Sequence, residues 1–383
     1  MSGRHSKHHN TLKLVIIGGG YAGLSALISL RHRAPDAEIT LIDPRPYHLL
    51  ITRLHETVRR PLKEIQIPFT KLARRFNFIH VQQPVRFDEE QLLTWNLQKC
   101  IQLDEQSLPF DYLLISVGTQ PNSSITADGV YDLDTLSRHC LATELDKLLS
   151  ATGQSEKTIN VIGAGPSGIQ FSFELASRLA GSHADYHVNL IDGGDRLLPL
   201  FPAAIGRYVK KRLDQKGITL LQSQFYRGQL DRELHLEHAH SGEKSILTSD
   251  LTLLLLGKTP RLLLHANSSG QVLVGEKRLN HIFTAGDCSY YDKMGSNLLT
   301  SQAAIRKGKA AANNILLKAG ILFFCLPYMH RDLGYLLSLG PEDGVGWLVS
   351  KNNIISGLPA YLAKQASEAQ YDLFLSGIDS YLI

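Results

Sequence analysis

Two stretches of the chain share one pattern of apolar runs and glycines. The first begins with Leu14–Ile17, an uninterrupted apolar run that is typical of a parallel strand buried on both faces. It leads into the glycine motif 18–23, and apolar residues then recur at helical spacing (Leu24, Leu27, Ile28, Leu30). A second strand at 38–42 ends at Asp43. This order predicts a βαβ unit.

The same pattern returns about 145 residues later. An apolar strand at 158–162 runs into the glycine motif 163–168, a helix is expected through 179, and a strand at 187–191 ends at Asp192. Two such copies, each with an acid at the tip of the next strand, predict two dinucleotide-binding units in one chain.

Each glycine of the motif has its own physical role. The first allows the tight turn from strand to helix, the second lets the backbone approach a pyrophosphate, and the third allows close helix–strand packing. The pyrophosphate then lies at the helix N-terminus, where free N–H groups and the helix dipole favour an anion. The acids Asp43 and Asp192 are placed to accept hydrogen bonds from a ribose diol.

Composition narrows the class of protein. The 383 residues suffice for two to three domains, and 43% hydrophobic with 20% charged residues predicts a soluble globular chain. The net charge of +4 argues against a general nucleic-acid binder. The longest apolar stretches, 251–256 and 321–326, are too short to span a bilayer. Residues 1–10 are polar and rich in histidine, which predicts a disordered tail rather than a signal peptide.

The cysteines exclude two kinds of chemistry. Cys100, Cys140, Cys288 and Cys325 are far apart, and no CxxC or CxxxxC pair occurs. This spacing excludes a zinc ribbon and an adjacent redox-active dithiol, and no metal site is predicted.

Three further motifs carry a family resemblance. A strand ends in Gly118, another apolar strand ends in Gly257, and the segment 282–288 runs from a strand into Gly286-Asp287. With the two glycine motifs, these residues resemble the two-dinucleotide-binding-domain flavoproteins, the FAD-dependent pyridine nucleotide-disulfide oxidoreductases. The resemblance covers about residues 12–346, and within it the branch that fits best is the type II NADH dehydrogenases, NADH:quinone reductases. The segments that match this branch are 41–50, 196–199, 301–303 and 330–340.

The resemblance implies a fold and its boundaries. The expected class is α/β, with two Rossmann-like domains and a small C-terminal cap. We expect an FAD-binding domain at 11–118 and 272–326, an NAD(P)H-binding domain at 119–271 and a C-terminal region at 327–383.

The resemblance also implies site residues. FAD would be held by Gly18, Gly20, Tyr21, Ala22, Gly23, Asp43, Val85, Gly118, Asp287 and Ala303, with the N-terminus of a helix starting at Ser301 beside the flavin. NADH would be held by Gly163, Gly165, Gly168, Asp192 and Gly257. The residues implied in catalysis are Gln170, Gln302 and Arg306. A carboxylate at Asp192 favours NADH over NADPH, although the nearby Arg196 leaves use of NADPH open.

The chain departs from this branch at three places. Gln170 stands where a glutamate is usual near the nicotinamide, and Arg306 stands where a second glutamine is usual near the quinone. The C-terminal region is short, with one set of amphipathic turns (Leu358, Tyr361, Leu362, Gln365). This tail could pack on the body, on a partner subunit in a homodimer, or on a membrane. The expected location is cytoplasmic, with peripheral attachment to the inner face of the membrane as one option.

Two other functions stay open from the sequence. Cys288 and Cys325 would suit a sulfide:quinone reductase, in which paired cysteines beside the flavin carry a persulfide. The two departures at Gln170 and Arg306 would also suit a flavoprotein that serves a protein partner, as in relatives of apoptosis-inducing factor.

Overall fold

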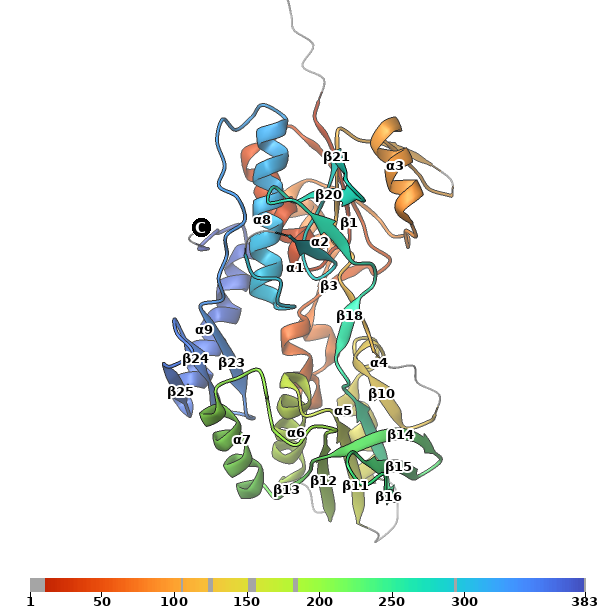
Figure 1. Cartoon of the computed structure of the whole chain (residues 1–383), viewed down its shortest axis with the longest axis vertical. Helices are drawn as coiled ribbons and strands as arrows, with labels where there is room; N and C mark the ends of the chain where they lie inside the picture. The colour runs from red at the N-terminus through yellow and green to blue at the C-terminus, as the bar shows by residue number, and fades with distance from the viewer. Residues whose placement is uncertain are drawn as a thin grey trace, which may run out of the picture.

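Two sheets, one mixed and one parallel, are each built around one predicted βαβ unit and form the two lobes of the molecule (Figure 1). The computed structural model describes residues 11–104, 106–122, 127–150, 156–181, 185–292 and 295–381. The tail predicted for residues 1–10 lies outside the described residues. No helix within the described ranges has both the length and the apolar character needed to cross a membrane.

The first lobe contains the N-terminal unit, β1 (Lys13–Ile17), α1 (Tyr21–Arg33) and β2 (Glu38–Ile42). Strand β1 lies at the centre of the parallel part of an eight-stranded sheet, which explains why its apolar run is buried. The sheet order is β22 (Ser289–Tyr291), β19 (Leu264–Ala266), β20 (Gln271–Val274), β21 (Lys277–Thr284), β8 (Tyr112–Ile115), β1, β2 and β5 (Ile79–Val81).

Helix α8 (Ser301–Lys318) packs directly against α1, as Figure 1 shows. The close approach requires a glycine, because a Cβ on Gly308 would lie 2.2 Å from the backbone oxygen of Ala22. Ser25 Oγ also donates to the carbonyl oxygen of Ile305 at 2.9 Å. The start of α8 is therefore held beside the start of α1, next to the first glycine motif.

The second lobe repeats the plan with β11 (Lys157–Ile162), α6 (Pro166–Leu179) and β12 (Tyr186–Ile191). Its five parallel strands lie in the order β10 (Val130–Asp132), β17 (Leu251–Leu254), β11, β12 and β13 (Ile218–Leu221). An antiparallel sheet and two helices accompany it: β14 (Gln224–Leu230), β15 (Glu233–His238), β16 (Lys244–Thr248), α5 (Leu141–Ser150) and α7 (Ala203–Gln215).

A C-terminal cap lies beside both lobes. It consists of β23 (Gly334–Ser338), β24 (Gly344–Leu348), β25 (Ile354–Ser356) and α9 (Leu358–Leu375). Asp343 accepts hydrogen bonds from Tyr208 and Arg212 of the second lobe, whereas Asp372 pairs with Arg53 of the first. The tail predicted as a few amphipathic turns is therefore an 18-residue helix whose inner face packs on the body.

Shorter elements connect these parts. Strands β9 (Thr119–Pro121) and β18 (Lys258–Pro260) pair where the chain crosses between the lobes. The others are β3 (Tyr47–Leu49), η1 (Ile51–Val58), η2 (Leu62–Ile65), β4 (Gln66–Pro68), α2 (Phe69–Phe76), α3 (Glu89–Gln98), β6 (Cys100–Gln102), β7 (Ser107–Pro109) and α4 (Leu133–Leu136). The domain division stays a prediction; β19 joins the first sheet, although it precedes the predicted boundary at residue 272.

Candidate functional site

Both glycine motifs open into one cavity of about 1810 Å³ between the lobes and the cap. A site for one drug-sized ligand usually measures roughly 300–1,000 Å³, so this cavity has room for two large ligands at once. Its wall includes the start of α8 and residues of α9 as well as both motifs.

The cavity brings together most of the residues predicted from the sequence. Fifteen of the eighteen line it: Gly18, Gly20, Tyr21, Ala22, Asp43, Val85, Gly118, Gly163, Gly165, Gln170, Asp192, Gly257, Asp287, Gln302 and Arg306. Gly23, Gly168 and Ala303 do not line it. Ala303 is buried, and its backbone N–H donates to Thr300 Oγ1 at 3.1 Å, so the hydroxyl of Thr300 already caps the start of α8.

The first motif forms a cradle with space only at its second glycine. Gly18 has a φ of +101°, which favours glycine, and a Cβ on Gly23 would lie 1.9 Å from the backbone oxygen of Gly18. Gly20 has ordinary extended backbone, and a Cβ there would meet nothing within 4 Å. Gly18 and Gly23 are thus required by the protein itself, whereas the lack of a side chain at Gly20 leaves room for something else.

The second motif has the same geometry. Gly163 has a φ of +102°, and a Cβ on Gly168 would lie 1.8 Å from the backbone oxygen of Gly163. Gly165 is extended and open, like Gly20. An open glycine at the N-terminus of a helix that has no side-chain cap fits a pyrophosphate, which would accept from the free N–H groups there.

The two acids tie their cradles together in the same way. Asp43 accepts from the backbone N–H of Gly19 at 2.7 Å and from that of Arg45 at 2.9 Å. Asp192 accepts from the backbone N–H of Ala164 at 2.6 Å and from that of Gly194 at 2.8 Å. Each carboxylate therefore holds a glycine loop in shape and also faces the cavity, where it can accept from a ribose hydroxyl.

Arg196, which left use of NADPH open, does not pair with Asp192 in this arrangement. Its guanidinium donates to the carbonyl oxygen of Phe201 at 3.1 Å. Arg196 therefore leaves the carboxylate of Asp192 unpaired by this guanidinium, and the preference for NADH stays a prediction.

Asp287 has a partner that the sequence did not reveal. Lys258 of β18 donates to its Oδ2 at 2.7 Å, and both residues line the cavity. The two segments are 29 residues apart, and they meet because β18 crosses between the lobes. The lysine orients the carboxylate of a residue that the resemblance assigns to FAD binding.

An Asp287→Ala variant should lower the flavin content of the purified protein. The change removes a charged hydrogen-bond acceptor, worth about 1.5–3 kcal/mol, and it leaves Lys258 without this partner. The ratio of visible to ultraviolet absorbance after gel filtration measures the effect, with Lys258→Gln as the companion variant that retains the acceptor. Full yellow colour in Asp287→Ala would contradict the assignment.

The part of the cavity wall at the start of α8 carries two of the predicted catalytic residues. Gln302 Nε2 donates to Ser367 Oγ of α9 at 3.3 Å, and the guanidinium of Arg306 lies 5.6 Å from the ring centroid of Tyr381. Burial raises the pKa of Tyr381, so its hydroxyl stays protonated. This wall combines an amide and a cation from α8 with an aromatic ring from the residues that follow α9.

Gln170 contacts two residues that sequence reasoning missed. Its Nε2 lies 3.1 Å from His55 Nε2 and 2.9 Å from Ser338 Oγ, and Ser338 Oγ lies 2.9 Å from His55 Nε2. We call these three residues the polar node. They come from α6, η1 and β23, so the node joins both lobes and the cap. No local pattern in the sequence links them.

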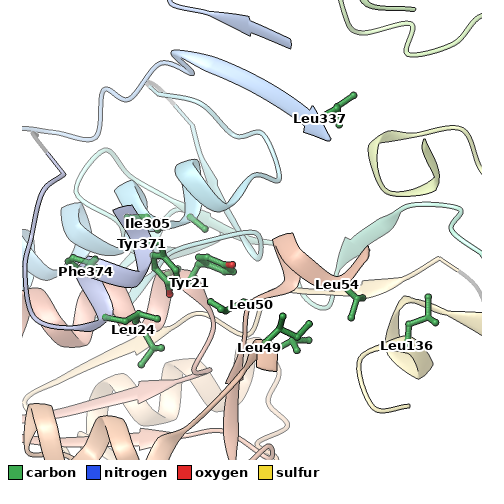
Figure 2. Packing of buried hydrophobic residues seen from close by; sticks show 14 of the residues in the cluster. Tyr21, Leu24, Leu49, Leu50, Leu54, Leu136, Ile305, Leu337, Tyr371 and Phe374 are labelled. Carbon is green, nitrogen blue, oxygen red and sulfur yellow. The ribbon is translucent and has the colours of Figure 1, made fainter. Parts of the chain in front are cut away.

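A second missed contact fastens the first cradle. His48 is fully buried; its Nδ1 lies 2.9 Å from the carbonyl oxygen of Gly19, and its Nε2 lies 3.1 Å from the Tyr371 hydroxyl. Tyr371 also stacks on Tyr21 with ring centroids 4.4 Å apart, and Figure 2 shows these two rings facing each other beside Ile305 and Leu24. Through Tyr371, which also lines the cavity, helix α9 thereby supports the cradle.

This buried histidine predicts a loss of stability in acid. Burial lowers the pKa of His48 from 6.5 to about 4, so the unfolded chain binds the extra proton between these values. His48 thus contributes up to about 3 kcal/mol above pH 6.5, and this is lost as the pH falls toward 4.

Urea titrations at several pH values would measure this effect. His48→Gln, which can still hydrogen-bond but cannot titrate in this range, should flatten the slope of unfolding free energy against pH. His32→Gln, at an exposed position of α1, is the control and should not. Equal slopes in wild type and His48→Gln would contradict the prediction.

The cysteines do not meet in the cavity. Cys288 is buried, with its thiol 3.5 Å from the carbonyl oxygen of Ala285, and Cys325 donates to Asn314 Oδ1 at 3.0 Å. Neither residue lines the cavity, and burial raises the pKa of both thiols. A cysteine pair carrying a persulfide beside the flavin therefore has no support in this geometry.

Comparison with known proteins decides the family. The family model described as pyridine nucleotide-disulphide oxidoreductase matches residues 12–308. The chain belongs to this family. Membership of the pyridine nucleotide-disulphide oxidoreductases implies binding of a pyridine nucleotide and a flavin, which fits the two cradles.

Individual members of the family are similar over nearly the whole chain. The type II NADH:quinone oxidoreductase of Staphylococcus epidermidis (strain RP62A) is 25% identical over 402 residues, and that of Staphylococcus aureus (strain NCTC 8325) is 24% identical over 405; each match covers 96% of both proteins. The predicted resemblance to this branch is confirmed.

Solved structures of the family share the fold. NDH2 from Plasmodium falciparum in complex with NADH superposes with a TM-score of 0.78 at 16% identity, covering 93% of this chain and 94% of that one. The sulfide:quinone oxidoreductase of Aquifex aeolicus gives 0.74 at 17% identity, covering 97% and 93%. The predicted α/β class with two Rossmann-like domains and a cap is confirmed.

Proposed function

We propose that this chain is an FAD-dependent oxidoreductase that oxidises NADH and reduces a quinone. The observation that carries the proposal is the pair of equivalent glycine cradles that open into one cavity. The similarity to type II NADH:quinone oxidoreductases over 96% of the chain supports the choice of donor and acceptor.

In this proposal the residues of the first lobe hold FAD and those of the second lobe hold NADH. The open positions Gly20 and Gly165 receive the two pyrophosphates, and Asp43 and Asp192 accept from the riboses. Asp287, oriented by Lys258, accepts from the flavin ribityl chain. Bound FAD supplies the redox chemistry by taking a hydride from NADH and passing two electrons to the acceptor.

The wall formed by α8 and the cap is assigned to the quinone. Gln302 can donate to one quinone oxygen, and Arg306 can stabilise negative charge as the oxygen gains electrons. Ile305, Leu299 and Leu336 provide apolar surface for the ring. The Tyr381 hydroxyl, which burial keeps protonated, can donate a hydrogen bond to a quinone oxygen, and the one further proton that quinone reduction consumes comes from solvent.

Anaerobic stopped-flow spectroscopy tests the proposed function. On mixing, NADH should bleach the flavin absorbance. NADPH should bleach it more slowly than NADH does, and sulfide should leave it unchanged. A short-chain quinone added next should restore the absorbance. Bleaching by sulfide alone would favour a sulfide:quinone reductase, and bleaching by NADH without recovery by quinone would favour a flavoprotein that serves a protein partner.

We also propose peripheral attachment to the inner, cytoplasmic face of a membrane through the segment 321–333. This segment exposes large apolar side chains, with Phe323 98%, Phe324 74% and Leu333 62% exposed. Leu333 also lines the cavity, so the same segment joins the apolar surface to the quinone wall. A bilayer that covers it would deliver an apolar acceptor directly to the cavity.

Sedimentation with phosphatidylcholine–phosphatidylglycerol vesicles tests this attachment. The double variant Phe323→Ser/Phe324→Ser should remain in the supernatant while wild type pellets. Leu97→Ser is the matched control, because Leu97 is 73% exposed but lies on α3. Equal pelleting of all three proteins would contradict the proposal.

A further inference from the structure

The polar node of His55, Ser338 and Gln170 holds an amide at the cavity wall. His55 is 4% and Ser338 2% exposed, whereas Gln170 is only partly buried and lines the cavity. All hydrogen bonds found for the Gln170 side chain among the described residues involve Nε2. Its Oε1 is therefore the atom left for a ligand in the cavity.

The chemistry of His55 and Ser338 explains why the Gln170 amide turns its nitrogen toward them and its oxygen away. Burial, reinforced by the charges of Lys364 and Arg59, holds the pKa of His55 well below its ordinary value. The ring is therefore neutral and has one nitrogen that accepts a hydrogen bond. With Nε2 as that nitrogen, Ser338 Oγ accepts from the amide N–H and directs its own hydrogen to His55 Nε2, so both partners suit the amide nitrogen rather than the amide oxygen.

Gln170 also has a fixed place relative to the second cradle. It follows Gly165 by five residues on α6, whose N-terminus is open to the cavity. Arg59, which directly follows η1, pairs with Glu174 one turn further along the same helix. Helix α6 and η1 are thus held together, and His55 cannot easily move away from Gln170.

From this geometry we propose that His55 is a positioning residue, which holds the Gln170 amide with its oxygen toward the carboxamide of the nicotinamide. Resting on the proposed function, this inference assigns recognition of the nicotinamide end of NADH to an uncharged acceptor. A carboxamide –NH₂ donates to Gln170 Oε1, and the His55 ring and Ser338 prevent the amide from turning over.

The test compares two ligands that differ only at the nicotinamide end. Calorimetric titration of the FAD-loaded protein with NAD⁺ and with ADP-ribose separates recognition of the nicotinamide from recognition of the rest of the nucleotide. His55→Leu should weaken NAD⁺ binding about tenfold, which corresponds to the loss of roughly one net hydrogen bond. The affinity for ADP-ribose should stay within about twofold of the wild-type value. His187→Leu, at a histidine of β12 bonded to Thr219, is the control and should change neither.

A double-mutant cycle shows whether His55 acts through Gln170. In a Gln170→Leu background, His55→Leu should cause no further loss of NAD⁺ affinity. Equal loss of NAD⁺ and ADP-ribose affinity, or fully additive losses in the cycle, would overturn the inference. Should His55→Leu fail to fold, Ser338→Ala removes one partner of the same amide and enters the same cycle. Wild-type protein that binds neither ligand would overturn the proposed function, and the inference with it.

Discussion

A Gly20→Val variant is expected to purify without flavin while keeping its fold. The backbone at Gly20 is extended, and a Cβ there meets no protein atom within 4 Å, so the protein itself tolerates a side chain. Valine would occupy the space that the FAD pyrophosphate needs at the N-terminus of α1. Loss of two charged hydrogen bonds to that N-terminus should weaken FAD binding roughly 100-fold or more.

Two measurements separate loss of flavin from loss of fold. Flavin fluorescence during titration of the apoprotein gives the affinity, and circular dichroism with urea denaturation gives the stability, which should fall by about 1 kcal/mol because valine is a poor N-cap residue. Gly181→Val, at an exposed glycine after α6, is the matched control and should bind flavin normally. A Gly20→Val protein that retains its yellow colour would contradict the assignment of this cradle.

A Gly165→Val variant should show the converse behaviour, with flavin present and reduction by NADH lost. Gly165 has the same open, extended geometry as Gly20, but it lies at the start of α6 in the second lobe. The added side chain should obstruct only the nicotinamide dinucleotide. We expect the NADH affinity to fall roughly 100-fold or more, for the same reason as at Gly20.

Anaerobic stopped-flow spectroscopy measures this loss directly. Dithionite should still bleach the flavin of Gly165→Val at the wild-type rate, which shows that the flavin itself is intact. Reduction by NADH at the wild-type rate would contradict the assignment. The two valine variants together assign each cradle to its own cofactor, because each one serves as the control for the other.

The sequence predicted the two cradles well because their determinants are local. In each copy, strand, glycines, helix and acid lie within 35 residues, and periodicity with glycine spacing describes that range directly. The structure shows the conformations expected from the motif: a positive φ at the turn glycines Gly18 and Gly163, and no space for a Cβ at the packing glycines Gly23 and Gly168. The cofactors assigned to the individual residues stay predictions.

The C-terminal helix was harder to predict. Its buried positions are Ala360, Lys364, Tyr371, Phe374 and Leu375. Because one of these residues is a lysine, the buried face does not stand out as a continuous apolar stripe in the sequence. Lys364 is tolerated there because it pairs with Glu368 at 2.5 Å. A pattern based on hydrophobicity alone therefore found only the first turns of α9.

By itself, the sequence determined the two βαβ units, their glycine and acid positions, and the absence of a close cysteine pair, since each depends on residues near one another along the chain. Only the tertiary structure decided what completes the site: Lys258 on Asp287, His48 and Tyr371 at the first cradle, and the His55–Ser338 pair on Gln170. Each of these contacts joins segments 29 to 323 residues apart. Such contacts arise when the lobes and the cap pack together, and no local pattern in the amino-acid sequence indicates which distant residues will meet.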